Sequence, residues 1–184
     1  MKGLFRKFTV RDLVLIAAMA ALGIAIKPVV VPLAHLISTP LMIPGGALAG
    51  GLYMMWIVVA FGLTGKHGTA TLVGLVQAIL VMITGVSGSH GAMSLLSYTM
   101  PGILVDVVFL ILRRGIDSMP LSLLAGILAN VAGTVCVNFV FFSLPLIPML
   151  LSLCVAAFSG GVGGVLSWLL LEALGRYGIR RKKT

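Results

Sequence analysis

The sequence has 184 residues, of which 60% are hydrophobic and only 9% are charged, and its formal net charge is +9. A water-soluble domain usually carries about a quarter charged residues, so this composition excludes a chain that covers itself with a water-facing surface. Lipid is therefore the expected solvent, and backbone groups in lipid must be paired within helices or a closed barrel. The apolar runs are continuous rather than alternating, which favours helices over barrel strands.

Six apolar runs approach the ~20 residues that a helix needs to cross a bilayer. They cover residues 12–27, 41–63, 69–84, 94–112, 121–143 and 149–174. A shorter apolar stretch, residues 29–40, follows Pro28 and is expected to be re-entrant or interfacial. We therefore predict an all-α integral membrane bundle of six transmembrane helices, which forms a single membrane domain over residues 1–184.

The basic residues test this span count. With the N-terminus in the cytoplasm, twelve of the thirteen basic residues fall in cytoplasmic segments, and only Lys27 falls on the outer side. Such a positive-inside bias orients membrane proteins, so both termini are predicted to be cytoplasmic. Residues 1–11 then form a basic leader and residues 175–184 a basic tail. Anionic lipid headgroups account for the net charge, and no nucleic-acid partner is expected.

Small residues recur at intervals of four in several spans, which lets another helix approach closely. In the first span they lie on a terminal helix with a free flank, so they are either a docking surface for another membrane protein or a packing surface within the bundle. These residues are Ala17, Ala21 and Ala25. Glycines of the same spacing favour packing within the bundle, namely Gly46 with Gly50 and Gly160 with Gly164.

Neutral polar and aromatic side chains gather at mid-depth or towards the outer side of the predicted bundle. A set of amides, hydroxyls and rings without strong charge suits a small, largely neutral, ring-containing ligand, although each one alone is more often a contact between helices. The outer connectors beside them contain His35 and His90. The predicted substrate-binding residues are Tyr53, Gln77, His90, Ser97, Tyr98, Asn130 and Asn138.

Other chemistry is not expected in this chain. Asp106 lies in the cytoplasmic third of its span and is interpreted as a structural or coupling residue. The turn from Gly62 to His67 lacks the spacing of a nucleotide-binding loop, so the chain is not expected to hydrolyse ATP. The two cysteines have no metal-like spacing with histidine and are expected to pack against apolar neighbours. No catalytic residue, metal site or cofactor is predicted.

Six short helices, the alanine stripe and the lack of an ATPase motif resemble the substrate-binding S components of energy-coupling factor (ECF) vitamin transporters. The resemblance is nearest to the branch linked to thiamine and its hydroxymethylpyrimidine precursor. It extends from Gly51 to Gly85 and from Pro101 to Phe109, followed by Arg113. The resemblance covers about two thirds of the chain, and its motifs are diffuse.

The resemblance implies a multi-pass subunit of a cell membrane, prokaryotic in type, that captures a vitamin or vitamin precursor from outside. It would dock through the alanine stripe onto a membrane coupling subunit driven by two cytoplasmic ATPases, which use the ATP. Asp106 matches a position that is acidic in the thiamine-precursor branch, but other carboxylates of that branch are replaced by apolar residues and Gln77. This favours a neutral pyrimidine over thiamine and leaves cobalamin open. A self-contained small secondary transporter, possibly dimeric, is the alternative.

Overall fold

The computed structural model describes residues 7–41, 43–85 and 91–179, and all regular structure within these ranges is helical. Seven α-helices form the bundle: α1 (Val10–Ala25), α2 (Lys27–Ser38), α3 (Gly45–Thr64), α4 (Thr69–Thr84), α5 (Ser94–Leu112), α6 (Met119–Val137) and α7 (Leu146–Arg176). Short 3-10 turns, η1 (Thr39–Leu41) and η2 (Gly91–Met93), precede α3 and α5, and a π-helical turn, η3 (Asn138–Phe142), extends α6. The all-α prediction is confirmed for these residues.

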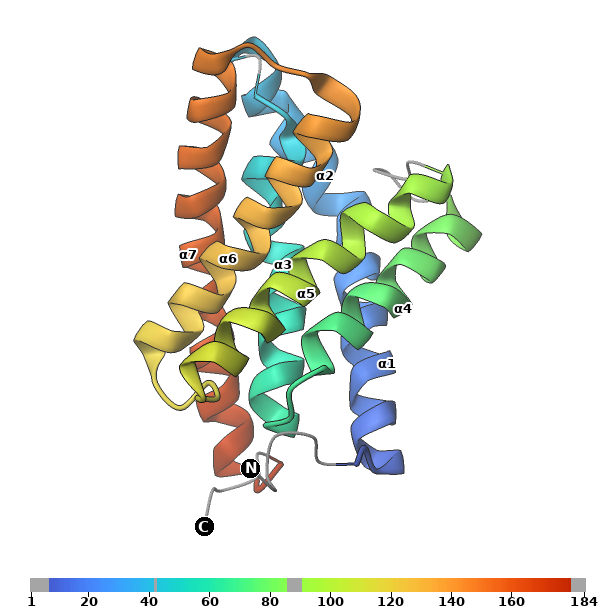
Figure 1. Cartoon of the computed structure of the whole chain (residues 1–184), viewed down its shortest axis with the longest axis vertical. Coiled ribbons are helices and arrows are strands. Elements are labelled where there is room, and N and C mark those ends of the chain that lie inside the picture. The colour runs from blue at the N-terminus through green and yellow to red at the C-terminus, as the bar shows by residue number, and fades with distance from the viewer. Residues whose placement is uncertain (1–6, 42, 86–90, 180–184) are drawn as a thin grey trace.

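The central helix is α3, which contacts α1, α2, α4, α6 and α7 (Figure 1). Its glycines allow a close approach to α7, because a Cβ atom added at Gly163 would lie 2.0 Å from the backbone oxygen of Gly51. Between α6 and α7, a Cβ atom added at Gly160 would lie 2.5 Å from the backbone oxygen of Gly126. The prediction that Gly50, Gly160 and Gly164 pack within the bundle is therefore confirmed.

Large apolar side chains cover much of the outer surface, as expected for a protein in lipid. Leu13, Ile111 and Phe158, on three different helices, are all more than half exposed. By length and composition α3, α5, α6 and α7 are able to cross a membrane, and the bent pair α1–α2 adds a fifth candidate span. Helix α4 is apolar but has only 16 residues. The chain is thus a multi-pass membrane protein, and the sixth span stays a prediction.

The stretch expected to be re-entrant or interfacial is the helix α2. It continues α1 after a bend of 41°, and Pro28 lies in its first turn, where a missing backbone N–H is tolerated. Helix α1 begins with a capping box, in which Thr9 and Asp12 each accept a hydrogen bond from the other's backbone N–H. The first predicted span is therefore a helix whose continuation changes direction.

The two ends of the bundle differ in charge. The start of α1, the α3–α4 turn, the α5–α6 turn and the end of α7 share one end, which we call the terminal end (Figure 1). The guanidinium of Arg11 donates to the backbone oxygen of Ile179 there, at 2.7 Å. Lys66, Arg113 and Arg114 lie at the same end, as the charge pattern predicts. That this end faces the cytoplasm stays a prediction.

Candidate functional site

A cavity of about 350 Å³ lies between α2, α3, α5 and α6, nearer the end of the bundle opposite the terminal end (Figure 1). The start of α3 leaves room for it, because Gly45 and Gly46 line the cavity without side chains. Gly45 also packs on His35, since an added Cβ atom would lie 2.7 Å from the imidazole ring. The volume is at the low end of the range for small-molecule sites, which suits a ligand of one or two rings.

Lys27 brings a positive charge into this cavity. It is the first residue of α2, at the bend after α1, and only 2% of its surface is exposed. Its ammonium donates to the hydroxyl of Tyr98. The Nζ atom lies 4.5 Å from the centroid of the Tyr98 ring and 4.9 Å from that of Tyr53. These cation–π contacts attract the ammonium but leave its charge uncancelled.

Ser97 supplies an unused hydroxyl beside Tyr98. The residue lines the cavity and is 4% exposed, and its Oγ has no hydrogen-bond partner among the described residues. Asn130 also lines the cavity, but its Nδ2 donates to the backbone oxygens of Ala47 and Ala156, both at 2.9 Å. Asn130 therefore joins α6 to α3 and α7, whereas the hydroxyl of Ser97 is not used in a contact between described helices.

Aromatic and apolar side chains form the remaining wall. Phe142 from η3 and Tyr53 from α3 provide ring surfaces, and Val31, Met54 and Val137 add aliphatic ones. Most of the surface inside the cavity is therefore apolar. A bound molecule would place its ring against this wall and its polar atoms towards Lys27 and Ser97.

The cavity brings together several of the residues predicted to bind substrate, namely Tyr53, Ser97, Tyr98 and Asn130. Gln77 does not line it: the residue is fully buried in α4 against Gly23 of α1, and neither of its amide atoms has a hydrogen-bond partner in the part of the chain that the structure describes. Asn138 is buried in η3, where its Oδ1 accepts from the backbone N–H of Leu144 at 3.0 Å. His90 lies outside the described residues.

The sequence interpretation missed the charged residue of the cavity. It predicted a site without strong charge and placed Lys27 only as the exception to the charge pattern. The structure places that ammonium inside the cavity, so the expectation of an uncharged lining was wrong. The position of Lys27 outside the charge pattern was the signal that could have identified it. A lysine at membrane depth is energetically costly and usually functional. Thr134 and Phe142 were also missed, and His35, expected in a connector, belongs to α2.

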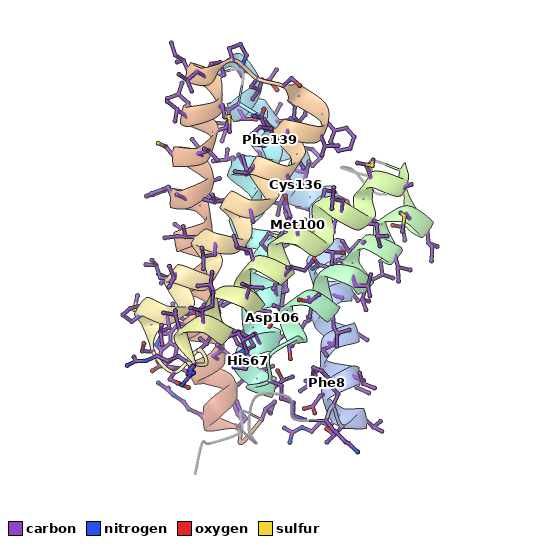
Figure 2. The ribbon with its side chains drawn as sticks, in the orientation of Figure 1. Phe8, His67, Met100, Asp106, Cys136 and Phe139 are labelled. Carbon is purple, nitrogen blue, oxygen red and sulfur yellow. The ribbon has the colours of Figure 1, made fainter. Side chains whose placement is uncertain are left out.

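Asp106 and His67 lie in the half of the bundle nearer the terminal end, away from the cavity (Figure 2). The carboxylate of Asp106 accepts from the backbone N–H of Gly68 at 2.8 Å. It also accepts from the backbone N–H and the hydroxyl of Thr71, each at 2.7 Å. Asp106 therefore ties α5 to the first turn of α4, where a negative charge is favourable. A coupling role for it stays a prediction.

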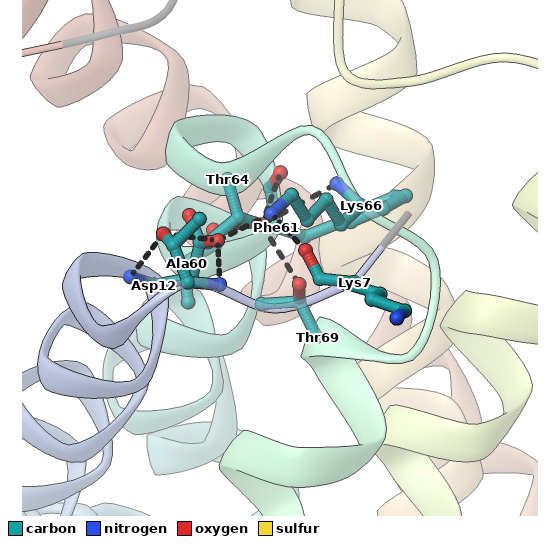
Figure 3. A network of polar contacts seen from close by, with 8 residues as sticks. Lys7, Asp12, Ala60, Phe61, Thr64, Lys66 and Thr69 are labelled. Carbon is teal, nitrogen blue, oxygen red and sulfur yellow. Dashed lines mark hydrogen bonds and ion pairs between the residues drawn. The ribbon is translucent and has the colours of Figure 1, made fainter. Parts of the chain in front are cut away.

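A second polar cluster joins α1 to the α3–α4 turn at the terminal end (Figure 3). The ammonium of Lys66 is paired with the carboxylate of Asp12 and donates to the backbone oxygen of Lys7 at 2.7 Å. Beside it, the hydroxyls of Thr64 and Thr69 are 2.7 Å apart. Each buried polar group named here has a partner within the cluster, so the cluster fixes the fold at this end.

The predicted docking residues lie on the outside of the bundle. Ala17, Ala21 and Ala25 are all exposed on α1. The opposite side of this helix, including Ile16 and Ala20, is buried. The small residues therefore form a narrow apolar strip that a helix of another protein is able to approach closely.

Comparisons with known proteins agree with this architecture. Residues 11–132 match a protein family described as "ABC-type cobalt transport system, permease component". Among solved structures, the fold is similar to one described as "Crystal structure of an S-component of ECF transporter", with a TM-score of 0.79 and 20% sequence identity. That alignment covers 94% of this chain and 88% of the other chain. At this identity the similarity shows the fold alone. No curated protein sequence matches this chain.

Proposed function

Because this chain belongs to the family of permease components of ABC-type cobalt transport systems, we propose that it is the substrate-binding membrane subunit of an ATP-driven, ECF-type importer. Membership makes it a membrane transport protein rather than an enzyme. The carrying observation is the cavity of about 350 Å³ between α2, α3, α5 and α6, in a fold like that of an ECF S component. In this proposal the cavity captures a solute from outside the cell.

The proposed cargo is a vitamin or vitamin precursor, and a pyrimidine precursor of thiamine is the favoured ligand. Tyr53, Tyr98 and Phe142 offer ring surfaces for such a molecule, and the volume of about 350 Å³ suits a single pyrimidine. A corrinoid such as cobalamin is much too large for this space. Thiamine itself carries a positive charge, which the Lys27 ammonium would repel.

A cobalt ion is a poor candidate for the cargo of this chain, although the family description names cobalt. Within the described residues no group of three or more His, Cys, Asp or Glu side chains is able to hold a metal ion. The cavity offers the imidazole of His35 but also the ammonium of Lys27. Divalent transition metals are held by several imidazole, thiolate or carboxylate ligands, and a neighbouring ammonium opposes their binding. The donor set therefore favours an organic cargo.

The proposed partners are a membrane coupling subunit and two cytoplasmic ATPase subunits, which consume the ATP. The exposed strip of Ala17, Ala21 and Ala25 supports a close helix–helix contact with the coupling subunit. The proposed location is the plasma membrane of a prokaryote, with the terminal end in the cytoplasm. Basic residues of that end, among them Arg113 and Arg114, would then face anionic lipids.

The variant Ala21→Trp tests this function. The indole would hold a partner helix away from α1, while the cavity lies between other helices. We expect uptake of radiolabelled hydroxymethylpyrimidine by cells to fall at least about tenfold, whereas binding to the purified variant stays unchanged. Ile111→Trp is the matched control, because it places the same side chain on an exposed apolar position of α5.

Copurification supplies the second arm of this experiment. The wild-type chain is expected to bring ATPase subunits with it from a gentle detergent extract, and Ala21→Trp to lose them. A chain that transports alone, with uptake unaffected by Ala21→Trp and by removal of the ATPases, would instead be the self-contained secondary transporter. That result would overturn the proposed function.

A further inference from the structure

We propose that the cavity ligand carries an acidic group, a carboxylate or a phosphate monoester, which sits against the ammonium of Lys27 and the hydroxyl of Ser97. The cargo would then be a small ring-containing acid rather than a neutral or cationic molecule. This inference rests on the proposed function, since it takes the cavity as the solute site. It adds the chemical class of the solute.

The ammonium of Lys27 is buried without an opposite charge beside it among the described residues. Lys27 is 2% exposed, so its ammonium has given up nearly all contact with water. An ammonium has three N–H donors, and Tyr98 is the one hydrogen-bond acceptor of Lys27 among the described residues. The rings of Tyr53 and Tyr98 attract the cation weakly compared with a carboxylate. A buried charge in this state is costly unless a partner of opposite sign completes it.

The acidic residues of the chain all lie away from the cavity. The sequence contains four, and all four lie in described segments near the terminal end. Asp12 is paired with Lys66, and Asp106 accepts from Gly68 and Thr71. The other two, Asp117 and Glu172, are exposed. None of these four side-chain carboxylates is therefore available to Lys27, which favours a negative charge supplied by a bound molecule.

The hydroxyl of Ser97 is a second donor in the cavity. Its Oγ is buried, lines the same cavity and has no partner among the described residues. Because it shares this cavity with the Lys27 ammonium, both groups are placed to donate to one bound molecule. A hydroxyl and an ammonium both donate hydrogen bonds, and charge-assisted bonds to an anionic oxygen are the strongest that they form.

The remaining lining residues indicate the chemistry of the part of the ligand that is not acidic. Tyr53 and Phe142 give ring surfaces, and Val31 and Met54 give aliphatic ones, so the wall suits the faces of a planar ring. A volume of about 350 Å³ leaves room for one such ring and one acidic substituent. The cavity is thus complementary to a molecule that is apolar on its faces and anionic at one edge.

Matched acid and neutral probes test this inference on the full-length protein in nanodiscs of phosphatidylcholine. One pair is pyrimidine-5-carboxylate and pyrimidine-5-carboxamide, and the other is hydroxymethylpyrimidine monophosphate and hydroxymethylpyrimidine. Titration calorimetry is expected to show the acid of at least one pair binding at least about tenfold more tightly than its neutral partner. Which acid binds separates a carboxylate cargo from a phosphate cargo.

Variants of the cavity link the preference to its residues. Lys27→Met keeps the length of the side chain, and we expect it to abolish the preference for the acid, while Lys27→Arg keeps part of it. Ser97→Ala should weaken the acid about three- to tenfold and leave the neutral probe unchanged. It also serves if Lys27→Met does not fold. Arg114→Met, which removes an exposed positive charge at the terminal end, is the control and should bind both probes as the wild type does.

Several results would overturn the inference. They are equal or tighter binding of the neutral probes, an acid preference that survives in Lys27→Met, and no binding of any of the four probes. Competition between phosphatidylglycerol in the nanodisc and the acidic probe would also overturn it, because the anion would then be a lipid headgroup. The proposed function fails separately: if neutral probes bind best and Ala21→Trp still blocks uptake, the importer subunit stands and only the acidic class is wrong.

Discussion

Two buried lysines, one at the terminal end and one in the cavity, have opposite surroundings. Lys66 at the terminal end is 4% exposed and is paired with the carboxylate of Asp12. Lys27 at the cavity is 2% exposed, and among the described residues its ammonium contacts one tyrosine hydroxyl and two ring faces but no carboxylate. The same charge is thus neutralised within the fold in one place and left open in the other.

The difference indicates that the charge of Lys66 stabilises the fold, whereas the charge of Lys27 is the one that we propose binds a ligand. Around Lys66 the hydrogen bonds of Lys7 and Asp12 complete the ammonium, so nothing further is needed there. Around Lys27 a single hydrogen bond to Tyr98 is present among the described residues, and in the proposal above a bound anion supplies the rest. A buried ion pair holds its partners in register, whereas a buried lone charge is tolerated for what it binds. The two lysines should therefore respond to the same substitution in opposite ways.

The largest expected effect is that of Lys66→Met, which leaves the Asp12 carboxylate buried without its partner. We expect the free energy of unfolding to fall by about 3–5 kcal/mol. Unfolding by sodium dodecyl sulfate in mixed micelles, followed by circular dichroism, measures this loss. Lys7→Met is the matched control, because the Lys7 side chain is exposed at the same end and should change stability by less than about 0.5 kcal/mol.

The double variant sharpens the result. Asp12→Asn in the Lys66→Met background removes the orphaned charge, so part of the lost stability should return. Acid binding in the cavity should be unchanged in both variants, since the cluster lies at the other end of the bundle. A Lys66→Met protein as stable as the wild type would show that this pair does not hold the terminal end together, and the comparison would fail.

The sequence predicts the features of this protein that depend on residues close together along the chain. Apolar length predicts the helices, and glycine spacing predicts the close approach of α3, α6 and α7, because both depend only on neighbouring residues. Tyr53, Ser97, Tyr98 and Asn130 were found from their depth in the bundle. Gln77 is at a comparable predicted depth, but it lies on α4, which contributes no residue to the lining of the cavity, and it packs against Gly23 of α1.

Lys27 escaped prediction for a different reason. Its place in the cavity depends on the bend of 41° between α1 and α2, which turns residues 27–38 into the bundle. In the sequence Lys27 ends the first predicted span, whereas residues 29–40 follow Pro28 and are too few to cross a membrane, so they are predicted to be re-entrant or interfacial. The depth of a residue in the membrane is predictable from the sequence where its helix is straight. The direction that α2 takes after the bend depends instead on packing against α3, which the residues around Lys27 do not specify.

Lys27→Met should change the free energy of unfolding in the opposite direction to Lys66→Met, or leave it unchanged. Lys27→Met removes a charge that nothing in the chain neutralises, so the free energy of unfolding without ligand should stay the same or rise by about 1 kcal/mol. The same detergent unfolding measurement applies, and the methionine fills the space between the Tyr53 and Tyr98 rings. A loss of more than about 2 kcal/mol would mean that Lys27 is structural, like Lys66.

The smallest expected effect is that of a substitution at Gln77, a buried polar residue that is part of neither the Lys66 cluster nor the cavity lining around Lys27. It is fully buried, and its amide nitrogen and oxygen have no hydrogen-bond partner among the described residues. We expect Gln77→Met to leave probe affinity unchanged, because Gln77 does not line the cavity. The free energy of unfolding should be nearly unchanged, with a gain of up to about 0.5 kcal/mol from removing unpaired polar atoms. Ser97→Ala is the comparison, because it removes an unpaired group that does line the cavity. Loss of ligand binding in Gln77→Met with unchanged stability would contradict this, and would mean that an unpaired buried amide is part of the site even where it does not line the cavity.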